Sequence, residues 1–250
     1  MTSKQPLNRI AETARAARDH VFSLATFWKR TVEVDGVKLT LDGASPRMRY
    51  VMFRGYESGD SSLALRHLTS TDRVLELGAS VGFLALRCRK AFPTIAYCMV
   101  EANPDLSAII RKNFELNGLL MGPLFSVAFG PNDGEVDFGI SENFWSSSLL
   151  TRATESRRVR IPMLSLSTIV SQMTYTPNVL LMDVEGAETS LNVTDLKPFS
   201  KLMIEFHPKL TGEHAVRDII SALNKAGFYE RDRDSATRYF ERKIPEGLGG

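Results

Sequence analysis

From Arg73 onward the sequence alternates short apolar runs with helical patterns, and this alternation constrains the fold more than any other feature. Runs such as RVLELGA and IAYCMVEA are typical of buried strands, while Asn103-Pro104 and Gly118 are start and stop signals of a helix. Strands that alternate with helices favour a parallel sheet covered on both faces. The last two runs, FYERDRD and TRYFERK, predict an antiparallel pair. We therefore expect an α/β fold with a mostly parallel sheet and an antiparallel last strand.

Further apolar runs predict the other strands. We expect PLFSVAFG to form a single third strand and GEVDFGIS to add an antiparallel one. NVLLMDVEG and KLMIEFHP predict two more strands, and helices are expected near Ser167–Met173 and over Glu213–Gly227. The closing residues EGLGG are expected to fray.

Residues 1–70 carry a different pattern, which predicts a helix, a hairpin and a second helix that extend a main domain of residues 71–250. The hairpin signal is Asp35-Gly36 between two alternating runs. A weaker helical stretch over Met48–Leu68 is interrupted near Gly55 and Gly59. We expect this extension to act as a cap over the substrate or as a dimer contact.

The first helix is predicted over Gln5–Arg30, because apolar residues recur there at alternating spacings of three and four. This heptad seam consists of Leu7, Ile10, Ala14, Ala17, Val21, Leu24 and Trp28. Because alanines weaken a coiled coil, packing on the chain's own domain is favoured over a homodimer contact or a lid. Phe22, Phe27 and Trp28 could still line the mouth of a substrate site.

Composition argues against several classes of partner. The net charge is +2, with basic residues spread among acidic ones, so nucleic acid is not expected as a partner. The two cysteines, Cys88 and Cys98, lie in apolar stretches and are expected to be buried free thiols. The sequence shows neither an apolar signal core nor a membrane-length apolar run. We expect a cytoplasmic protein that does not enter a membrane.

The turn after the first strand of the main domain is a candidate ligand site. Gly78 and Gly82 let the backbone turn sharply and let a ligand approach the next helix. The loop lacks G-x-G-x-x-G, which disfavours a nucleotide-dependent oxidoreductase. Glu101 ends the second strand, where a carboxylate can accept hydrogen bonds from two vicinal ribose hydroxyls. These two features together favour binding of an adenosine-like ligand.

The order of motifs resembles the FkbM-type methyltransferase family over roughly residues 73–208. The matching segments are LELGASVGF, MVEANPDLSAIIRKNFELNG, VAFGPNDGEVDF, SSSLL, LLMDVEGAE and KLMIEFHP. The resemblance implies a Rossmann-like seven-stranded methyltransferase fold with S-adenosylmethionine as methyl donor, and O-methylation of a small-molecule hydroxyl, such as that of a sugar. It also implies a set of cofactor-binding residues: Glu76, Gly78, Ala79, Ser80, Gly82, Phe83, Glu101, Ala102, Asn103, Ala128, Phe129 and Asp183.

Three positions depart from the family pattern. Ser80 stands where the family usually has asparagine, and serine keeps the ability to form a hydrogen bond. Pro131 replaces a common acidic residue, although Asn132 and Asp133 follow it. Met182 replaces a frequent lysine, so no lysine is available for catalysis at that position.

Candidate catalytic groups end two strands: Asp183 with Glu185, and Glu205 with His207. Residues two apart on a strand face the same side, so each pair can converge on one pocket. One of these groups would accept the proton of the acceptor hydroxyl. Such residues can also ligate Mg²⁺, but the spacing alone is weak evidence, and we expect no metal. His20, His67 and His214 lie in helical patterns and are expected to be structural or exposed.

Alternative functions stay open at this point. The acceptor could be a carboxylate, an amine or a protein side chain, or the chain could be a non-catalytic S-adenosylmethionine-binding subunit. We expect the N-terminal region and the insert Gly139–Arg160 to select the acceptor, but neither carries a recognisable code.

Overall fold

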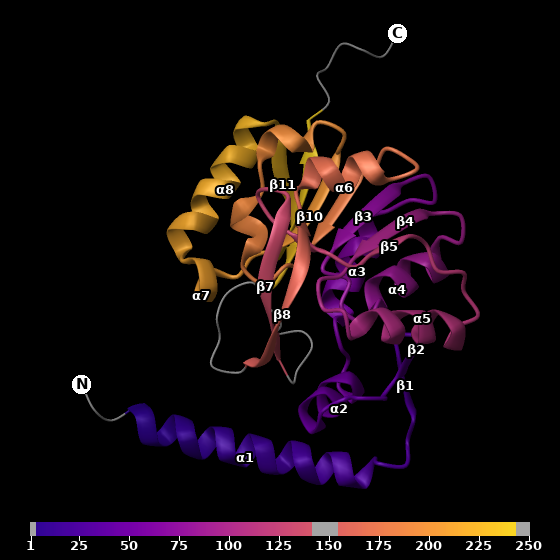
Figure 1. Ribbon diagram of the computed structural model, residues 1–250, viewed down its shortest axis with the longest axis vertical. Coiled ribbons are helices and arrows are strands. Elements are labelled where there is room, and N and C mark those ends of the chain that lie inside the picture. The colour runs from indigo at the N-terminus through magenta and orange to yellow at the C-terminus, as the bar shows by residue number, and fades with distance from the viewer. Residues whose placement is uncertain (1–3, 142–154, 244–250) are drawn as a thin grey trace.

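The computed structural model describes residues 4–141 and 155–243, and its main element is a seven-stranded sheet (Figure 1). In spatial order, its strands are β11 (Phe228–Asp234), β12 (Thr237–Arg242), β10 (Lys201–Glu205), β9 (Val179–Met182), β3 (Arg73–Leu77), β4 (Ala96–Val100) and β5 (Leu124–Phe125). The five strands from β10 to β5 are parallel, and β12 pairs antiparallel with both β10 and β11. The predicted mostly parallel sheet with its antiparallel last strand is confirmed.

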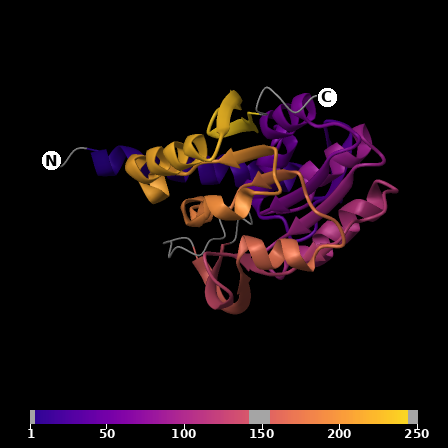
Figure 2. The same cartoon turned by 90° about the horizontal axis from the view of Figure 1, so that it is seen from above.

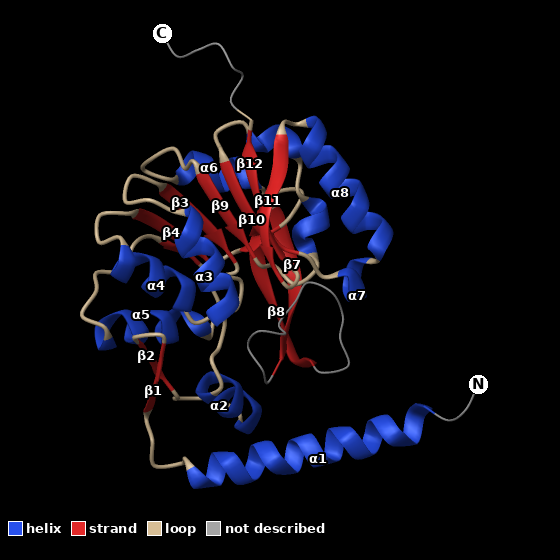
Figure 3. Cartoon of the chain, turned by 180° about the vertical axis from the view of Figure 1, so that it is seen from behind, coloured by secondary structure: helices blue, strands red, loops and turns tan. Residues whose placement is uncertain are grey.

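Helices cover both faces of this sheet (Figure 3). They are α3 (Ser58–His67), α4 (Phe83–Ala91), α5 (Leu106–Leu116), α6 (Leu166–Gln172), α7 (Pro208–Thr211) and α8 (Glu213–Lys225), with short 3-10 turns η2 (Ala187–Ser190) and η3 (Val193–Leu196). Side chains alternate along β3, so that Val74 packs with α4 and α5, while Leu75 packs in the core beneath α6 and α8. Burying a residue such as Leu223 of α8 contributes about 1.5–3 kcal/mol. Two cores thus hold the carboxyl edge of the sheet in place.

A separate three-stranded sheet corrects the predicted third strand. PLFSVAFG divides into β5, in the main sheet, and β6 (Ala128–Phe129), which pairs with β8 (Glu155–Leu164). Because β5 is an edge strand with one partner, its continuation can leave the sheet and pair elsewhere. The run GEVDFGIS forms β7 (Gly134–Ser141), which is antiparallel to β8 as expected, but outside the main sheet. The β7–β8 hairpin projects from the body of the molecule (Figure 2).

The N-terminal region contains a hairpin of β1 (Thr31–Val34) and β2 (Val37–Thr40), as expected at Asp35-Gly36. The predicted stretch over Met48–Leu68 forms two helices, α2 (Pro46–Phe53) and α3, on either side of Gly55. Ser45 caps α2, because its hydroxyl accepts a hydrogen bond from the backbone N–H of Met48.

Helix α1 (Lys4–Ala25) lies against α2, but not through the predicted seam (Figure 1). Asp19 is buried beside two arginines, and the ring of Phe22 packs edge-on against aromatic rings of α2. Val21, Leu24 and Trp28 of the seam are 61–66% exposed. The expectation that the seam packs on the domain is therefore wrong for these residues, because the buried aspartate and Phe22 turn another face towards α2. A dimer contact or lid stays a prediction.

Other expectations have mixed outcomes. Cys88 and Cys98 are buried and free. Within residues 4–141 and 155–243, no helix has the length and hydropathy needed to cross a bilayer. The motif Ser146–Leu150, residues 142–154 of the expected acceptor insert and the tail 246–250 lie outside the described residues.

Candidate active site

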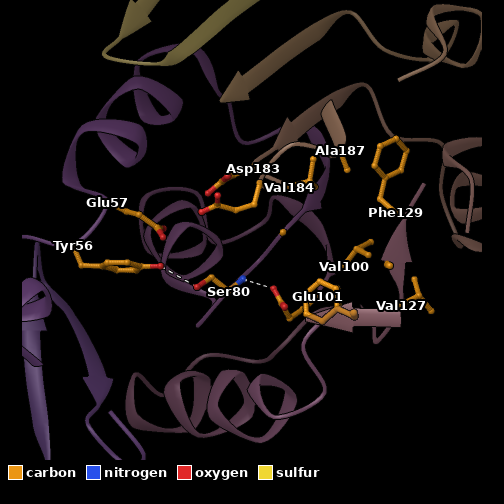
Figure 4. Close-up of a pocket in the computed structure, with 15 residues that line it drawn as sticks. Tyr56, Glu57, Ser80, Val100, Glu101, Val127, Phe129, Asp183, Val184 and Ala187 are labelled. Carbon is orange, nitrogen blue, oxygen red and sulfur yellow. Dashed lines mark hydrogen bonds between the residues drawn. The ribbon is translucent and has the colours of Figure 1, made fainter. Parts of the chain in front are cut away.

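A cavity opens at the carboxyl edge of the main sheet, where β3, β4 and β9 end (Figure 4). The strand order reverses at this point, because β4 and β5, which follow β3 in sequence, lie on one side of it, and the later strands β9 and β10 lie on the other. Ligands of open α/β sheets bind at such a switch point. We call this space the central cavity. The predicted residues that line it are Gly78, Ser80, Glu101, Ala102, Ala128, Phe129, Asp183 and Glu185.

Gly78 brings two loops together at the base of the cavity. Its φ is +89°, and a Cβ atom there would lie 1.7 Å from the carbonyl oxygen of Asp183. No other residue type fits this contact, so the glycine permits the loops after β3 and β9 to touch. Gly78 is thus expected to permit close approach of a ligand, and in the structure it also permits close approach of two backbone segments.

Glu101 lies at the end of β4 with both carboxylate oxygens held by backbone donors. Ser80 N–H donates to Oε2 and Asn103 N–H donates to Oε1, each at 2.7 Å. Burial raises the pKa of Glu101 to about 7, although these hydrogen bonds act in the opposite direction. Each oxygen keeps a further lone pair for a ligand donor. This oriented carboxylate suits a pair of vicinal hydroxyls.

Five predicted cofactor residues do not line the central cavity. Ala79 and Phe83 are buried in the core beside α4, and Gly82 packs against an isoleucine of α5. Asn103 is buried, and its side chain accepts a hydrogen bond from the backbone of the next turn. Glu76 is buried below the edge of the sheet and lines a neighbouring cavity instead. Four of these five residues therefore contribute to core packing or to local backbone structure. Glu76 is the exception.

Sequence reasoning missed two polar residues from the connection between α2 and α3. Tyr56 Oη lies 2.9 Å from Ser80 Oγ, and Glu57 lies beside it (Figure 4). Burial raises the pKa of Glu57 to about 8, with added effect from nearby acids. The remaining unpredicted lining residues are apolar: Val100, Val127, Phe138, Val184 and Ala187. The break at Gly55 and Gly59 was the available signal for a functional loop here.

The predicted catalytic groups do converge. His207 Nε2 lies 3.5 Å from Asp183 Oδ1, 3.6 Å from Glu185 Oε2 and 3.8 Å from Glu205 Oε1. Asp183 and Glu185 follow β9, whereas Glu205 ends β10 and His207 follows it. The parallel pairing of β9 with β10 therefore brings the two strand ends to one place.

Glu188 fixes the position of His207 from the side opposite Nε2. It was not among the predicted site residues. Its side chain is 0% exposed. Glu188 Oε1 accepts the backbone N–H of His207 at 2.8 Å, and the same oxygen lies 3.5 Å from His207 Nδ1. Glu188 Oε2 accepts the backbone N–H of Gly186. This arrangement directs Nε2 of the imidazole towards the three other carboxyl groups.

The protonation of this cluster departs from ordinary values. Burial raises the pKa of Asp183 well above its usual range, and the charges of Glu205 and Glu185 raise it further. The pKa of Glu205 is raised for the same reasons, by burial and by the charge of Asp60. Burial lowers the pKa of His207, but hydrogen bonding to Glu188 and nearby carboxylates outweigh it, so the net shift is upward. Each of the three groups therefore keeps its proton to a higher pH than it would in water, as is common at functional sites.

Backbone strain gathers around the cavity. The non-glycine residues with a left-handed φ in the described ranges are Asp35, Glu57, Ser80, Glu185 and Ser235. Asp35 and Ser235 lie in the tight turns of hairpins, where this conformation is common. Glu57, Ser80 and Glu185 line the central cavity. Strained residues that persist in this way are typical of functional sites.

A second cavity adjoins the central one below the ends of β9 and β10. The two share Glu57, Gly78 and Asp183. Its ionisable lining residues all carry carboxyl groups, so we call it the acidic cavity: Glu57, Asp60, Glu76, Asp183 and Glu205.

Comparison with known proteins found no matching family model and no match among curated proteins. Among solved structures, TYW2 from M. jannaschii in complex with AdoMet is 12% identical, with a TM-score of 0.47 over 85% of this chain and 86% of that one. Methyltransferase FkbM from Methylobacillus flagellatus is 16% identical, with a TM-score of 0.48, and the likeness covers 89% of this chain and 60% of that one. The precorrin-6y C5,15-methyltransferase from Geobacter metallireducens is 10% identical, with a TM-score of 0.44 over 74% of this chain and 86% of that one.

Proposed function

We propose that this chain is an FkbM-type, S-adenosylmethionine-dependent O-methyltransferase that acts on a hydroxyl group of a small molecule, such as a sugar or another metabolite. One observation carries the proposal. The central cavity has Glu101, a carboxylate oriented to accept two hydroxyls, at one side and Asp183, part of a proton-accepting cluster, at another (Figure 4). In the proposed reaction, Glu101 would hold the ribose and Asp183 would lie at the reacting end of the same cofactor.

The lining of the cavity suits the cofactor in polarity and in charge. The ribose hydroxyls would donate to Glu101, and the adenine ring would lie between apolar walls that include Val127 and Phe129. The sulfonium and the α-amino group of the cofactor are both positively charged, and they would favour the ionised forms of two carboxyl groups, Asp183 beside the sulfonium and Glu57 beside the α-amino group. We place the methyl group towards Asp183, at the border of the acidic cavity.

The chemical step is an in-line displacement at the methyl carbon. The acceptor oxygen forms a bond to this carbon as the carbon–sulfur bond breaks, and the electron pair of that bond leaves with neutral S-adenosylhomocysteine. The proton of the hydroxyl passes to Asp183 or, through Nε2, to His207, since each lies in the cluster beside the cavity. The protein contributes alignment and a proton acceptor.

An amine is the second candidate acceptor, and the acidic cavity favours it. Carboxyl groups such as Asp60 and Glu205 would attract a protonated amine to the same place. The cluster would then have to accept a proton from the ammonium form before methyl transfer.

Transfer of labelled methyl from S-adenosylmethionine into a metabolite extract tests the proposal. We expect a labelled product whose methyl group is bound to oxygen, identified by mass spectrometry and NMR. A product methylated on nitrogen would favour the amine candidate. No transfer to any metabolite, together with transfer to protein or RNA in a whole lysate, would contradict a small-molecule acceptor.

A further inference from the structure

We propose that a divalent cation of the Mn²⁺ type binds between Asp183, Glu205 and His207. Each of these residues offers one ligand atom, and the three atoms lie within 4.8 Å of one another. Metal–ligand bonds of about 2.1 Å place neighbouring ligand atoms about 3–3.5 Å apart. The distances of His207 Nε2 from Asp183 Oδ1 and Glu205 Oε1, 3.5 and 3.8 Å, need only small movements. The spacing in the sequence led us to expect no metal, and this cluster leads us to the opposite proposal.

A buried carboxyl oxygen without a hydrogen-bond partner gives a second reason, independent of the cluster. Glu76 is 4% exposed and lines the acidic cavity together with Asp183 and Glu205. The hydroxyl of Tyr97 lies near its carboxyl group, but Oε2 has no hydrogen-bond partner. Leaving such an oxygen unpaired away from water is costly. A cation in this cavity, with its bound water, would offer positive charge and donors to this oxygen.

The charges around the cluster also call for a cation. The carboxyl groups of Asp183 and Glu205 lie within hydrogen-bonding reach of each other, and Asp183 Oδ1 is buried without a hydrogen bond. In the described part of the chain, His207 is the basic residue that forms ion pairs with both of them. Two facing carboxylates cannot both be ionised without a proton or a cation between them.

Glu188 orients His207 in the way that metal-binding histidines require. The other ring nitrogen of such a histidine usually contacts a carboxylate or a carbonyl group. Here Glu188 Oε1 lies 3.5 Å from Nδ1 and also fixes the backbone of His207. The lone pair of Nε2 is thereby directed at the position between the two carboxylates.

Two carboxylates and one imidazole suit Mn²⁺ and related first-row divalent ions. If the chain is the proposed methyltransferase, the ion would bind the acceptor hydroxyl and lower the pKa of that hydroxyl. The acceptor would then lie in the acidic cavity with its oxygen facing the methyl group.

The test is a titration of the chelator-treated full chain with Mn²⁺, read from the loss of the EPR signal of free Mn²⁺. We expect one bound ion per chain. Glu205→Gln and His207→Ala should weaken binding by at least roughly tenfold, and Glu188→Gln by roughly 10- to 100-fold. His214→Ala is the matched control, because that imidazole is 83% exposed on α8 and pairs with Asp218. Thermal unfolding of each variant checks that it is folded.

Absence of Mn²⁺ binding by the unaltered chain would overturn the proposal, as would equal binding by folded Glu205→Gln. A parallel titration with S-adenosylhomocysteine separates the two proposals. Binding of S-adenosylhomocysteine without Mn²⁺ rejects only the ion site, whereas binding of Mn²⁺ without S-adenosylhomocysteine supports the ion site and rejects the methyltransferase.

Discussion

Glu101 follows β4 and Asp183 follows β9, the two strands on either side of β3. Both residues line the central cavity, yet their surroundings differ. Backbone N–H groups hold both oxygens of Glu101 at 2.7 Å. Oδ1 of Asp183 is buried without a hydrogen bond, and its carboxyl group faces Glu205 and His207. An acid satisfied by the backbone has a fixed orientation and suits binding. An acid crowded by like charges has a raised pKa and suits proton transfer or cation binding.

The largest effect is expected where the two regions touch, at Gly78. Gly78→Val should destabilise the fold by about 4 kcal/mol or more, because its side chain would overlap the carbonyl of Asp183. Gly43→Ala is the control, since Gly43 also has a positive φ but nothing lies within 4 Å of its Cβ position. That substitution should cost only about 1–2 kcal/mol. Denaturant unfolding measures both, and equal losses would contradict the contact.

The next effect belongs to the Asp183 side alone. Asp183→Asn should lower turnover by about 10²–10⁴-fold, the usual contribution of a general base, once an acceptor is known. Affinity for S-adenosylhomocysteine should change little, because we do not expect Asp183 to hold the adenosine. His207→Ala, measured in the same way, tells which of the two accepts the proton. Near-normal turnover in both variants would mean that alignment alone drives the transfer.

The Glu101 side should show the reverse pattern, a loss of binding. Glu101→Ala should weaken the binding of S-adenosylhomocysteine by about 1.5–3 kcal/mol, as expected for hydrogen bonds to a charged group. Calorimetry measures this loss, with Glu135→Ala as the control, because Glu135 is 60% exposed and pairs with Arg160 at the surface. Unchanged affinity in a folded Glu101→Ala variant would remove Glu101 from the cofactor site.

The smallest effect concerns stability and pH at Glu76. Burial raises the pKa of Glu76 to about 8, so the folded state holds a proton that the unfolded state loses near pH 4.5. The stabilisation is complete below that pH and is lost as pH rises through 8. Glu76→Gln should therefore flatten the fall in melting temperature between about pH 5 and 8, by about 2–4 °C for each kcal/mol retained. The measurement needs a chelating buffer, and an unchanged slope would exclude Glu76 as its source.

The sequence correctly predicts residues that meet because they end parallel strands of one sheet. The apolar runs before Glu101, Asp183 and Glu205 are buried parallel strands, so their carboxyl ends had to meet at one edge. The prediction was wrong where pairing between distant segments determines the structure. Ala128 pairs with β8, although it follows β5 closely in sequence. Edge strands carry no local signal for the partner of their continuation.

The site residues that the sequence did not predict were missed for the same reason. Tyr56 reaches the cavity because α3, which follows it, packs against α4 and β11, and nothing near Tyr56 in sequence indicates that contact. Glu188 belongs to LLMDVEGAE, one of the segments that resemble the FkbM-type family, but its role depends on the backbone N–H of His207, which follows a different strand. Local patterns predict which residues end a strand, whereas the partner of each side chain depends on distant segments.

The most direct test of the central claim is a calorimetric titration of the unaltered chain with S-adenosylhomocysteine and, side by side, with NAD. The account predicts that one S-adenosylhomocysteine binds per chain and that NAD does not, because the loop from Gly78 to Gly82 lacks G-x-G-x-x-G. Binding of NAD without S-adenosylhomocysteine would contradict it.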